Sequence, residues 1–371
     1  NKEIVNSVNK GLIHIYEPYL DILVKEVVSK NLLIAASEPQ ESEVYIITVP
    51  TPFKKTQNKL PEPSIDFVET AIISIIPLLK KGDQVIIEST CPVGTTRKIS
   101  KIIDKLSEVK SDDIFLSYCP ERVLPGNILE ELVENDRVIG GFTEASGEYA
   151  KKFYKKFCKG QLIITDDKTA ELVKLAENSY RDVSIAFANE LSIIADHFDV
   201  RVNELIKIAN HHPRVEILNP GCGVGGHCIA VDPWFIASSV PDKSGLIQMA
   251  RKVNLNKEEW VINQIIEKAK EKRNDLNREP LIGLMGLSFK PNIDDLRESP
   301  AFKIAIKLHN LDLNLLYCEP NIKSHKNFNL HSLEYLLKKA DFIVFLVKHN
   351  EFLKIDLTKF DYIDFCGVEN I

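Results

Sequence analysis

The chain has 371 residues, of which 44% are hydrophobic and 27% charged, and its formal net charge is −6, values typical of a globular protein with two or three domains. It has no long basic run, and its longest apolar runs have only the length of a strand, so we expect neither a nucleic-acid nor a membrane partner. Nothing at the N-terminus resembles a signal peptide, and we expect a cytoplasmic protein.

Residues 1–166 are predicted to form a parallel sheet with helices on both faces, because short aliphatic runs alternate with helical periodicity. Two helices, 2–8 and 17–30, are predicted before the sheet, and the proline-rich loop 50–63 is predicted to be irregular. The predicted strands are 32–36, 44–49, 84–88, 114–119, 138–139 and 162–164, and the helices among them are 64–79, 95–106 and 143–158.

Residues 167–274 are predicted to form a central helical domain, because helical periodicity continues through 168–199 and 244–273 without a strand signal. Strands and helices then alternate again, with strands at 281–287, 314–317, 342–347 and 362–365 and helices at 300–308 and 333–339. We therefore predict an α/β fold in which two Rossmann-like, doubly wound domains, 1–166 and 275–371, are joined by the helical domain.

One expected motif is not found near the N-terminus. A dinucleotide-binding domain begins with a strand, a G-x-G-x-x-G turn and a helix whose N-terminus holds the pyrophosphate. Residues 1–30 read as helices instead, so we expect the first βαβ turn of the N-terminal domain to be missing from this chain.

Several predicted strands are followed by loops with hydroxyl or charged side chains, and ligands of doubly wound sheets bind beyond the carboxyl ends of the strands. Thr51, Thr90 and Glu121 each follow such a strand. Ordinary turn chemistry explains the prolines and glycines of these loops, but it explains Glu121 less well. After a later strand, Lys290 and Arg297 offer cationic groups that match phosphate oxygens.

Lys174 and Asn178 lie four residues apart in the predicted helix 168–199 and therefore share one of its faces. A solvent-exposed polar stripe is the common explanation of such a pair. The alternative is a lysine that points into a cleft and stabilises negative charge developing on an oxygen.

A dense run of glycines precedes one cysteine in N-P-G-C-G-V-G-G-H-C-I-A-V-D-P-W-F at 219–235. Glycine lets another group approach the backbone closely, so the turn 223–226 favours a ligand beside Cys228, with a flexible surface loop as the alternative. If a helical turn follows Cys228, its free N–H groups favour the thiolate, which can attack an aldehyde carbon. Asp232 and Pro233 are a typical helix start, and this capping role does not exclude a functional one.

The seven cysteines are scattered, odd in number and without a C-x-x-C pair, which fits a reducing compartment. Cys222, Cys228 and the nearby histidines could suggest zinc. Their spacing does not follow a structural zinc site, so we expect no metal.

Seven segments together resemble the nucleotide-sugar 6-dehydrogenases, the UDP-glucose/GDP-mannose dehydrogenase family. They occur in the family's order and cover nearly the whole chain. The segments are V-P-T-P (49–52), E-S-T-C-P-V-G-T-T (88–96), C-P-E-R-V-L-P-G (119–126), A-E-L-V-K-L-A-E-N (170–178), F-A-N-E (187–190), G-V-G-G-H-C-I-A-V-D-P (223–233) and F-K-P-N-I-D-D-L-R-E-S-P (289–300). The stretch G-H-C-I-A-V-D-P-W-F is most similar to the UDP-N-acetyl-D-mannosamine dehydrogenases, whereas UDP-glucose enzymes more often have a serine before the cysteine and a lysine before the aspartate.

The resemblance implies that the C6 alcohol of UDP-N-acetyl-D-mannosamine is oxidised to a carboxylate in two NAD-dependent steps. It implies that Cys228 attacks the intermediate aldehyde, that Lys174 and Asn178 stabilise the oxyanion, that Asp232 supports proton transfer and that Glu121 positions or activates water. It further implies NAD contacts for Thr51, Thr90 and Arg297, and nucleotide-sugar contacts for Val123, Leu124, Pro125, Gly126, Arg214, Gly223, Gly225, Gly226, Phe289 and Lys290.

By the same resemblance we expect a cytoplasmic homodimer, joined through the helical domain, that acts in polysaccharide biosynthesis. Arg214 matches an arginine that reaches the neighbouring subunit's site. Within the family, UDP-GlcNAc, UDP-glucose and GDP-mannose are rival substrates. Outside it, the alternatives are a two-domain hydroxy-acid dehydrogenase that uses a lysine and no thiol, and a non-catalytic nucleotide-sugar binding module.

Overall fold

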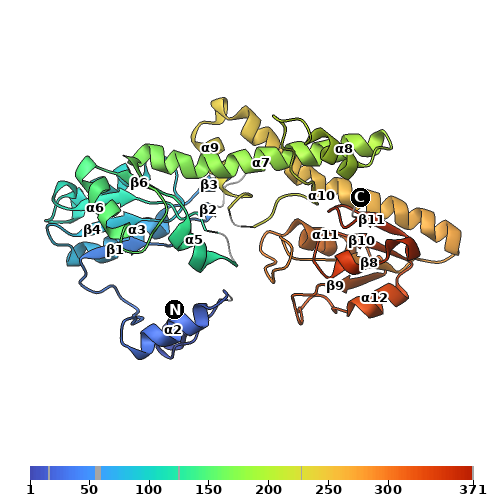
Figure 1. Cartoon of the computed structure of the whole chain (residues 1–371), viewed down its shortest axis with the longest axis horizontal. Helices are drawn as coiled ribbons and strands as arrows, with labels where there is room; N and C mark the ends of the chain where they lie inside the picture. Colours follow the sequence, from blue (N-terminus) through green and yellow to red (C-terminus); the bar gives the residue numbers. More distant parts are fainter. Residues whose placement is uncertain (16, 55–59, 124–125, 227, 370–371) are drawn as a thin grey trace. The chain divides into compact units, whose positions relative to one another are not determined.

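The structure is a computed structural model that describes residues 1–371 except 16, 55–59, 124–125, 227 and 370–371. The chain divides into two units, unit 1 (1–176) and unit 2 (177–371) (Figure 1). The boundary between the units falls inside the long helix α7 (Asp167–His197). The finer division into domains at 1–166, 167–274 and 275–371 stays a prediction.

The centre of unit 1 is a five-stranded sheet with the order β1-β4-β5-β6-β7. Its neighbouring strands are parallel except β5 and β6, which pair antiparallel, so the prediction of an all-parallel sheet was wrong at this point. Among its described residues, the connection from β5 to β6 contains one helix, the short α5 (Ile128–Glu134), whereas a parallel crossover usually needs a helix that runs back along the sheet. The strands are β1 (Val44–Ile47), β4 (Gln84–Ile87), β5 (Phe115–Tyr118), β6 (Arg137–Gly141) and β7 (Leu162–Asp166).

Helices cover both faces of this sheet, because successive apolar side chains of β4 point to opposite faces and both are buried. Val85 and Ile87 pack into a core with α3 (Asp66–Ile75) and α4 (Thr95–Leu106), whereas Ile86, which points the other way, packs with α6 (Glu144–Tyr154). The prediction of helices on both faces is thereby confirmed.

Residues 1–43 form the helices α1 (Lys2–Asn9) and α2 (Leu20–Ser29) and contain no strand among the described positions. The predicted strand 32–36 was wrong. The backbone groups of Ala35 instead exchange two hydrogen bonds with the side-chain amide of Asn9, which replaces a strand partner.

The loop 50–63 is less irregular than predicted, because β2 (Phe53–Lys54) and β3 (Glu62–Pro63) pair antiparallel. The described part of the chain also has the short 3-10 helices η1 (Ile76–Leu78), η2 (Ser111–Asp113), η3 (Pro241–Lys243), η4 (Phe352–Lys354) and η5 (Leu357–Lys359).

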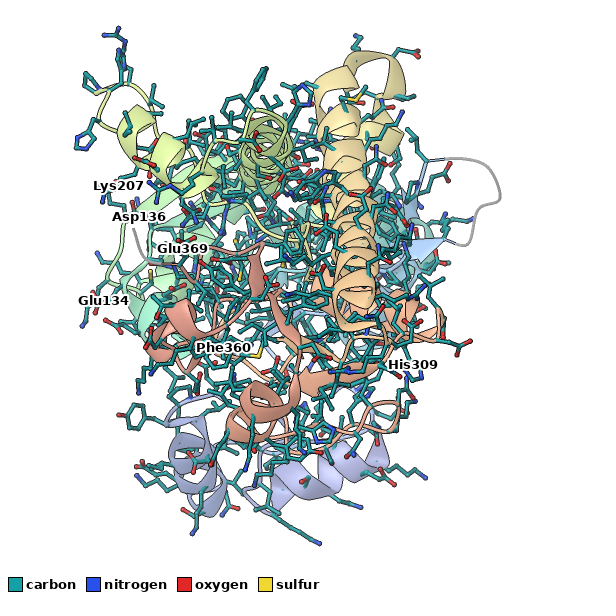
Figure 2. All side chains as sticks on the ribbon, turned by 90° about the vertical axis from the view of Figure 1, so that its right-hand side faces the viewer. Glu134, Asp136, Lys207, His309, Phe360 and Glu369 are labelled. Atoms are coloured by element: carbon teal, nitrogen blue, oxygen red, sulfur yellow. The ribbon has the colours of Figure 1, made fainter. Side chains whose placement is uncertain are left out.

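Unit 2 contains a four-stranded parallel sheet with the order β11-β10-β8-β9. Phe342 and Val344 face the helices α10 (Gly245–Leu276) and α11 (Pro300–His309), and Ile343 and Phe345 face α12 (Leu333–Lys339). This second sheet therefore also has helices on both faces. The strands are β8 (Ile282–Met285), β9 (Leu315–Cys318), β10 (Phe342–Phe345) and β11 (Tyr362–Asp364). His309, labelled in Figure 2, ends α11, and its Nδ1 lies 3.0 Å from the hydroxyl of Tyr317.

The helical part of unit 2 is built on α7 and α10, with α8 (Val202–Ala209) and α9 (Asp232–Ser239) between them in the chain. Buried polar groups join the two long helices: the carboxylate of Asp182 accepts from Arg251 at 2.6 Å and from Asn254 at 2.8 Å. None of the helices among the described residues combines the length and apolarity needed to cross a membrane.

Candidate active site

In unit 1, Glu121 lies in the loop after β5 and is held by backbone and side-chain donors. Its Oε1 accepts from the N–H groups of Arg122 and Val123 at 2.6 and 3.2 Å, and its Oε2 lies 3.1 Å from the guanidinium of Arg137. Arg137 is 5% exposed, whereas the side chain of Glu121 is 30% exposed. The carboxylate of Glu121 therefore pairs with a buried cation but is itself still accessible to solvent, which suits a group that handles water.

Arg137 also holds a second carboxylate at the end of a strand. Its guanidinium lies 3.4 Å from Glu88 and stacks over the ring of Tyr154 at 4.5 Å, and Tyr154 donates its hydroxyl to Glu88. Burial raises the pKa of Glu88, and the Tyr154 hydrogen bond and Arg137 oppose that rise. Sequence reasoning missed both residues, because Arg137 directly precedes the predicted strand 138–139 and Tyr154 lies inside the predicted helix 143–158, and neither segment was given a functional role.

Lys174 is buried and points toward the loop after β5 that carries Glu121. The interpretation of Lys174 as part of a solvent-exposed polar stripe was therefore wrong. Its Nζ donates to the backbone carbonyl of Glu121 at 2.7 Å. A lysine on α7 is thereby fixed beside the Glu121 carboxylate loop.

Glu171 fixes the loop that carries Thr90. Its carboxylate accepts from the N–H of Gly94 and from both the N–H and the hydroxyl of Thr96, so the first turn of α4 is capped by a side chain of α7. Thr90 and Thr51 lie partly buried in the loops that follow β4 and β1. Sequence reasoning quoted Glu171 within a motif and gave it no role.

The structure describes only part of the loop 123–126, which is predicted to contact the nucleotide-sugar. Leu124 and Pro125 lie outside the described residues. Val123 donates to Glu121, and the N–H of Gly126 donates to Glu17 at 2.8 Å. Glu17, which is 3% exposed, also accepts from Ile128 at the start of α5, and sequence reasoning missed it.

In unit 2, Asn178 and Asp232 form a buried pair. The amide Nδ2 of Asn178 donates to Oδ2 of Asp232 at 2.6 Å. Asp232 is the first residue of α9 and Val231 occupies the cap position, so the prediction that Asp232 caps this helix was wrong by one residue. The carboxylate of Asp232 is instead directed to α7.

Three glycines of the turn 223–226, at positions 223, 225 and 226, stand where a larger residue would be strained or would clash. Gly223 and Gly226 have φ of 138° and 82°, in the region that favours glycine. A Cβ on Gly225 would lie 2.6 Å from the carbonyl oxygen of Glu298, and one on Gly226 would lie 2.9 Å from the ring of Phe289. The turn therefore packs against the loop 288–300, which rules out the interpretation as a free surface loop.

Buried amides hold the start of this turn. The side chain of Asn189 accepts from the N–H of Gly221 at 2.9 Å and donates to Asn254 at 2.9 Å. Both asparagines are at most 1% exposed. Sequence reasoning assigned neither a role, although F-A-N-E contains Asn189.

Cys228 follows the turn and is the one exposed cysteine of the chain, whereas Cys366 is half-buried and the other five are buried. The backbone carbonyl of Cys228 accepts from the N–H groups of Val231 and Asp232 at 3.0 and 2.8 Å, so a helical turn follows it as expected. Among the buried thiols, desolvation raises the pKa of Cys222 and Cys119 to about 12. Accessibility thus sets Cys228 apart from the other cysteines.

Two predicted cations of unit 2 have different surroundings. Arg297 is exposed and bound to both carboxylate oxygens of Asp295, and this hydrogen bond, with a smaller contribution from Cys228, raises the pKa of the guanidinium. Arg214 lies in the exposed segment between α8 and α9. No group of three or more His, Cys, Asp or Glu residues in the described part of the chain is arranged to hold a metal.

Three domains of one known protein family match successive parts of the chain. Residues 1–158 match the NAD binding domain of the UDP-glucose/GDP-mannose dehydrogenase family, residues 168–256 its central domain and residues 283–363 its UDP binding domain.

Individual proteins agree with these matches. The UDP-N-acetyl-D-mannosamine dehydrogenase of Campylobacter jejuni is 49% identical over 99% of this chain and 91% of its own length. The NDP-N-acetyl-D-galactosaminuronic acid dehydrogenase of Ralstonia nicotianae is 47% identical over 96% of this chain and 85% of its own length. A solved UDP-D-ManNAc dehydrogenase from Pyrococcus horikoshii superposes with a TM-score of 0.89 at 35% identity, covering 100% of this chain and 89% of that one. The chain therefore belongs to the UDP-glucose/GDP-mannose dehydrogenase family and is an NAD-dependent nucleotide-sugar dehydrogenase.

Proposed function

We propose that this enzyme oxidises the C6 alcohol of UDP-N-acetyl-D-mannosamine to the carboxylate of UDP-N-acetyl-D-mannosaminuronate. The observation that carries the proposal is Cys228, an accessible thiol that in the chain follows a glycine turn and precedes Asp232, which is buried and paired with Asn178. A thiol so placed can bind an aldehyde covalently, which the second oxidation of an alcohol to an acid requires.

The carboxyl edge of the N-terminal sheet fits part of a dinucleotide. Thr51 and Thr90 are partly buried hydroxyl residues after the parallel strands β1 and β4, and we propose that they contact NAD, with Arg297 as a further contact. When bound, NAD⁺ supplies the hydride acceptor for each of the two oxidations.

The chain's own residues then have the following proposed roles. The first oxidation removes a hydride and a proton from the C6 alcohol and leaves an aldehyde. The thiolate of Cys228 adds to its carbon to form a thiohemiacetal, the second oxidation makes a thioester, and water releases the carboxylate and restores the thiol. Lys174 and Asn178 stabilise the oxyanion, Asp232 supports proton transfer, and Glu121 positions the attacking water.

We propose that the nucleotide-sugar is held by Val123, Gly126, Gly223, Gly225, Gly226, Phe289 and Lys290. Val123 and Gly126 lie in the loop after β5, and the others belong to the glycine turn and the loop that packs on it. The family's UDP binding domain includes Phe289 and Lys290, which supports this assignment.

We also propose that the enzyme is a homodimer joined through the helical part. Tyr180, Phe187 and Ile194 follow one another at intervals of seven residues on α7 and are 74%, 54% and 47% exposed. Side chains at this interval lie on one face of a helix, and an exposed apolar stripe is typical of a protein interface. In such a dimer, Arg214 would serve the site of the neighbouring subunit.

The cysteines of the chain are not joined in disulfides, which fits a reducing compartment and supports the proposed cytoplasmic location. A product of this class, a nucleotide-linked uronic acid, is a suitable donor for polysaccharide biosynthesis, and that setting stays our prediction.

A substrate panel tests the proposed reaction. We expect about two NADH per sugar, product mass of the acid, and a preference for UDP-ManNAc over UDP-GlcNAc, UDP-GalNAc, UDP-glucose and GDP-mannose. The galactosamine-type sugar belongs in the panel, because two similar relatives differ in the sugar that their names give. The variant Cys228→Ala should abolish acid formation. One NADH per sugar with a ketone product would refute the proposal, and UDP-sugar binding without NADH would favour a binding function.

A further inference from the structure

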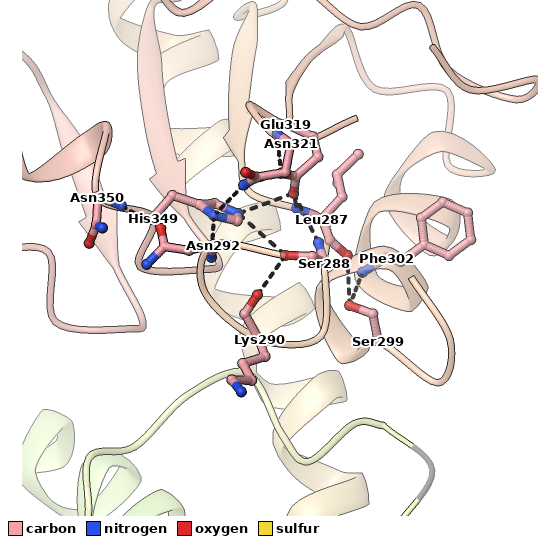
Figure 3. A network of polar contacts seen from close by, with 10 residues as sticks. All are labelled: Leu287, Ser288, Lys290, Asn292, Ser299, Phe302, Glu319, Asn321, His349 and Asn350. Atoms are coloured by element: carbon pink, nitrogen blue, oxygen red, sulfur yellow. Dashed lines mark hydrogen bonds and ion pairs between the residues drawn. The ribbon is translucent and has the colours of Figure 1, made fainter. Parts of the chain in front are cut away.

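A buried acid–histidine pair lies in unit 2 at the carboxyl edge of the second sheet. Glu319 follows β9 and His349 follows β10, and they are 4% and 0% exposed. Oε2 of Glu319 lies 3.2 Å from Nε2 of His349 and also accepts from the N–H groups of Leu287 and Ser288 at 2.7 and 3.0 Å (Figure 3). Burial raises the pKa of Glu319, but the hydrogen bonds from His349 and from the backbone outweigh it and leave that pKa below its ordinary value.

The contacts of His349 define which of its nitrogens carries the proton. Nδ1 lies 3.0 Å from the backbone N–H of Asn292 and 3.0 Å from the side-chain amide nitrogen of Asn321, and both of these groups are donors. Nδ1 is therefore the acceptor, so neutral His349 has its proton on Nε2 and donates toward Glu319.

The pair fixes both ends of the loop 288–292. Glu319 holds the N–H of Ser288 at one end, and His349 holds the N–H of Asn292 at the other. Inside the loop, the hydroxyl of Ser288 donates to the carbonyl of Lys290 at 2.8 Å (Figure 3). Asn292 has φ of 61°, and its side chain accepts from the N–H of Asn350, so the end of the loop is also tied to the chain after His349.

The fixed loop in turn supports the glycine turn before Cys228. Phe289 lies within it, and its ring occupies the space where a Cβ of Gly226 would stand. The β-carbon of Phe289 would lie 2.9 Å from a Cβ of Gly225. A displacement of the loop would therefore move Phe289 and Lys290 and remove the surface on which the turn packs.

We propose that Glu319 and His349 are positioning residues of the nucleotide-sugar site, which set the loop 288–292 and, through Phe289, the glycine turn that carries Cys228. The proposal rests on the proposed function for the role of that loop in binding the nucleotide. The pair does not act on the substrate directly, because both side chains are buried and bound to protein groups.

Equilibrium binding of UDP to the full chain tests the proposal, with NAD⁺ binding and thermal unfolding measured in parallel. His349→Leu removes the acceptor for Asn292 and the donor to the buried carboxylate of Glu319. It should raise the Kd for UDP by about tenfold or more, the effect of leaving a buried hydrogen-bonding group without its partner. His349→Asn should stay within about threefold of the wild type, because its Oδ1 can take the place of Nδ1. NAD⁺ affinity should not change in either variant.

His309→Leu is the matched control. His309 makes one hydrogen bond to Tyr317, and the loop takes no part in it, so the variant should leave UDP affinity unchanged. If His349→Leu does not fold, Ser288→Ala decides the matter, since it removes the bond to Lys290 and the 3.4 Å contact with Nε2 of His349 but keeps the contact between Glu319 and His349. It should weaken UDP binding, and an unchanged Kd would overturn the proposal.

Two further outcomes would overturn it: a folded His349→Leu that binds UDP like the wild type, or an equal loss of UDP affinity in the Leu and Asn variants. UDP contains no oxidisable sugar, so this measurement does not depend on Cys228 chemistry. If the substrate panel does not give the expected acid, but the Kd for UDP still changes in these variants as described, the proposed reaction is wrong and the positioning role stands.

Discussion

Asn178 donates its side-chain amide to the carboxylate of Asp232 over 2.6 Å, and both residues are buried. If Asp232 supports proton transfer, Asp232→Asn should lower kcat at least about a hundredfold, the lower range for general acid–base catalysis. An amide pair can still form, so the melting temperature should change little. Steady-state kinetics and thermal unfolding check this. The control is Asp242→Asn, an exposed residue beyond α9 that should have no effect on kcat, and an unchanged kcat in Asp232→Asn would contradict the assignment.

The second prediction concerns Arg137, which joins Glu88 and Glu121. Arg137→Met leaves two neighbouring carboxylates without their buried cation, so we expect a loss of about 3 kcal/mol in the free energy of unfolding. We also expect a lower kcat, because Glu121 loses the group that orients it. Arg137→Lys keeps the charge without the planar fork and should be intermediate.

A matched control for Arg137 is Glu134→Gln. It breaks an exposed ion pair with Lys159, in which the side chains of Glu134 and Lys159 are 52% and 72% exposed, and should change stability by less than about 1 kcal/mol. Urea unfolding and kinetics of the same samples separate the two effects. Equal destabilisation by Arg137→Met and Glu134→Gln would contradict the role of the buried cation.

Local signals in the sequence predicted most elements, and long-range contacts explain what they missed. The helix 95–106 was found with its observed bounds, because Gly94, the apolar periodicity and the polar break after Leu106 are all local. Ala35 was misread as part of a strand, since its partner Asn9 is 26 residues away.

The same distinction applies to the candidate site. Cys228 could be found from its glycines, which encode close backbone contacts in the residue type itself. Glu171, Glu319 and His349 could not, because the role of a buried polar side chain depends on partners from other segments, such as Thr96 for Glu171 or Leu287 for Glu319. A single sequence shows the polar residue and does not show its partners.

The third prediction concerns the apolar stripe on α7. Phe187→Asp places a charge at its middle, where a second copy is proposed to pack, and should convert dimers to monomers at micromolar concentration. Sedimentation or light scattering measures the mass. Leu106→Asp, an equally exposed apolar position at the end of α4, is the control and should leave the mass unchanged. A wild-type chain that is already monomeric would refute the proposed dimer.

The last prediction uses Lys257, which is 1% exposed and lines a cavity of about 150 Å³ in unit 2 together with Ser192 and Trp260. Its Nζ donates to Ser192 at 2.7 Å and lies 3.6 Å from the centre of the Trp260 ring. Burial lowers the pKa of Lys257 from an ordinary 10.5 to about 7.

Between these two values the unfolded chain binds a proton at Lys257 that the folded chain does not bind. The free energy of unfolding should therefore rise as the pH rises from about 7 toward 10. Below about pH 7 both states are protonated at Lys257, so this dependence on pH should vanish there. The total contribution across the window is at most about 5 kcal/mol. Lys257→Met should remove the slope, and Lys252→Met, an exposed lysine of the same helix, should keep it. Urea unfolding at several pH values measures the difference between each variant and the wild type, and a difference for Lys257→Met that does not vary with pH would show that Lys257 is not desolvated in the folded protein.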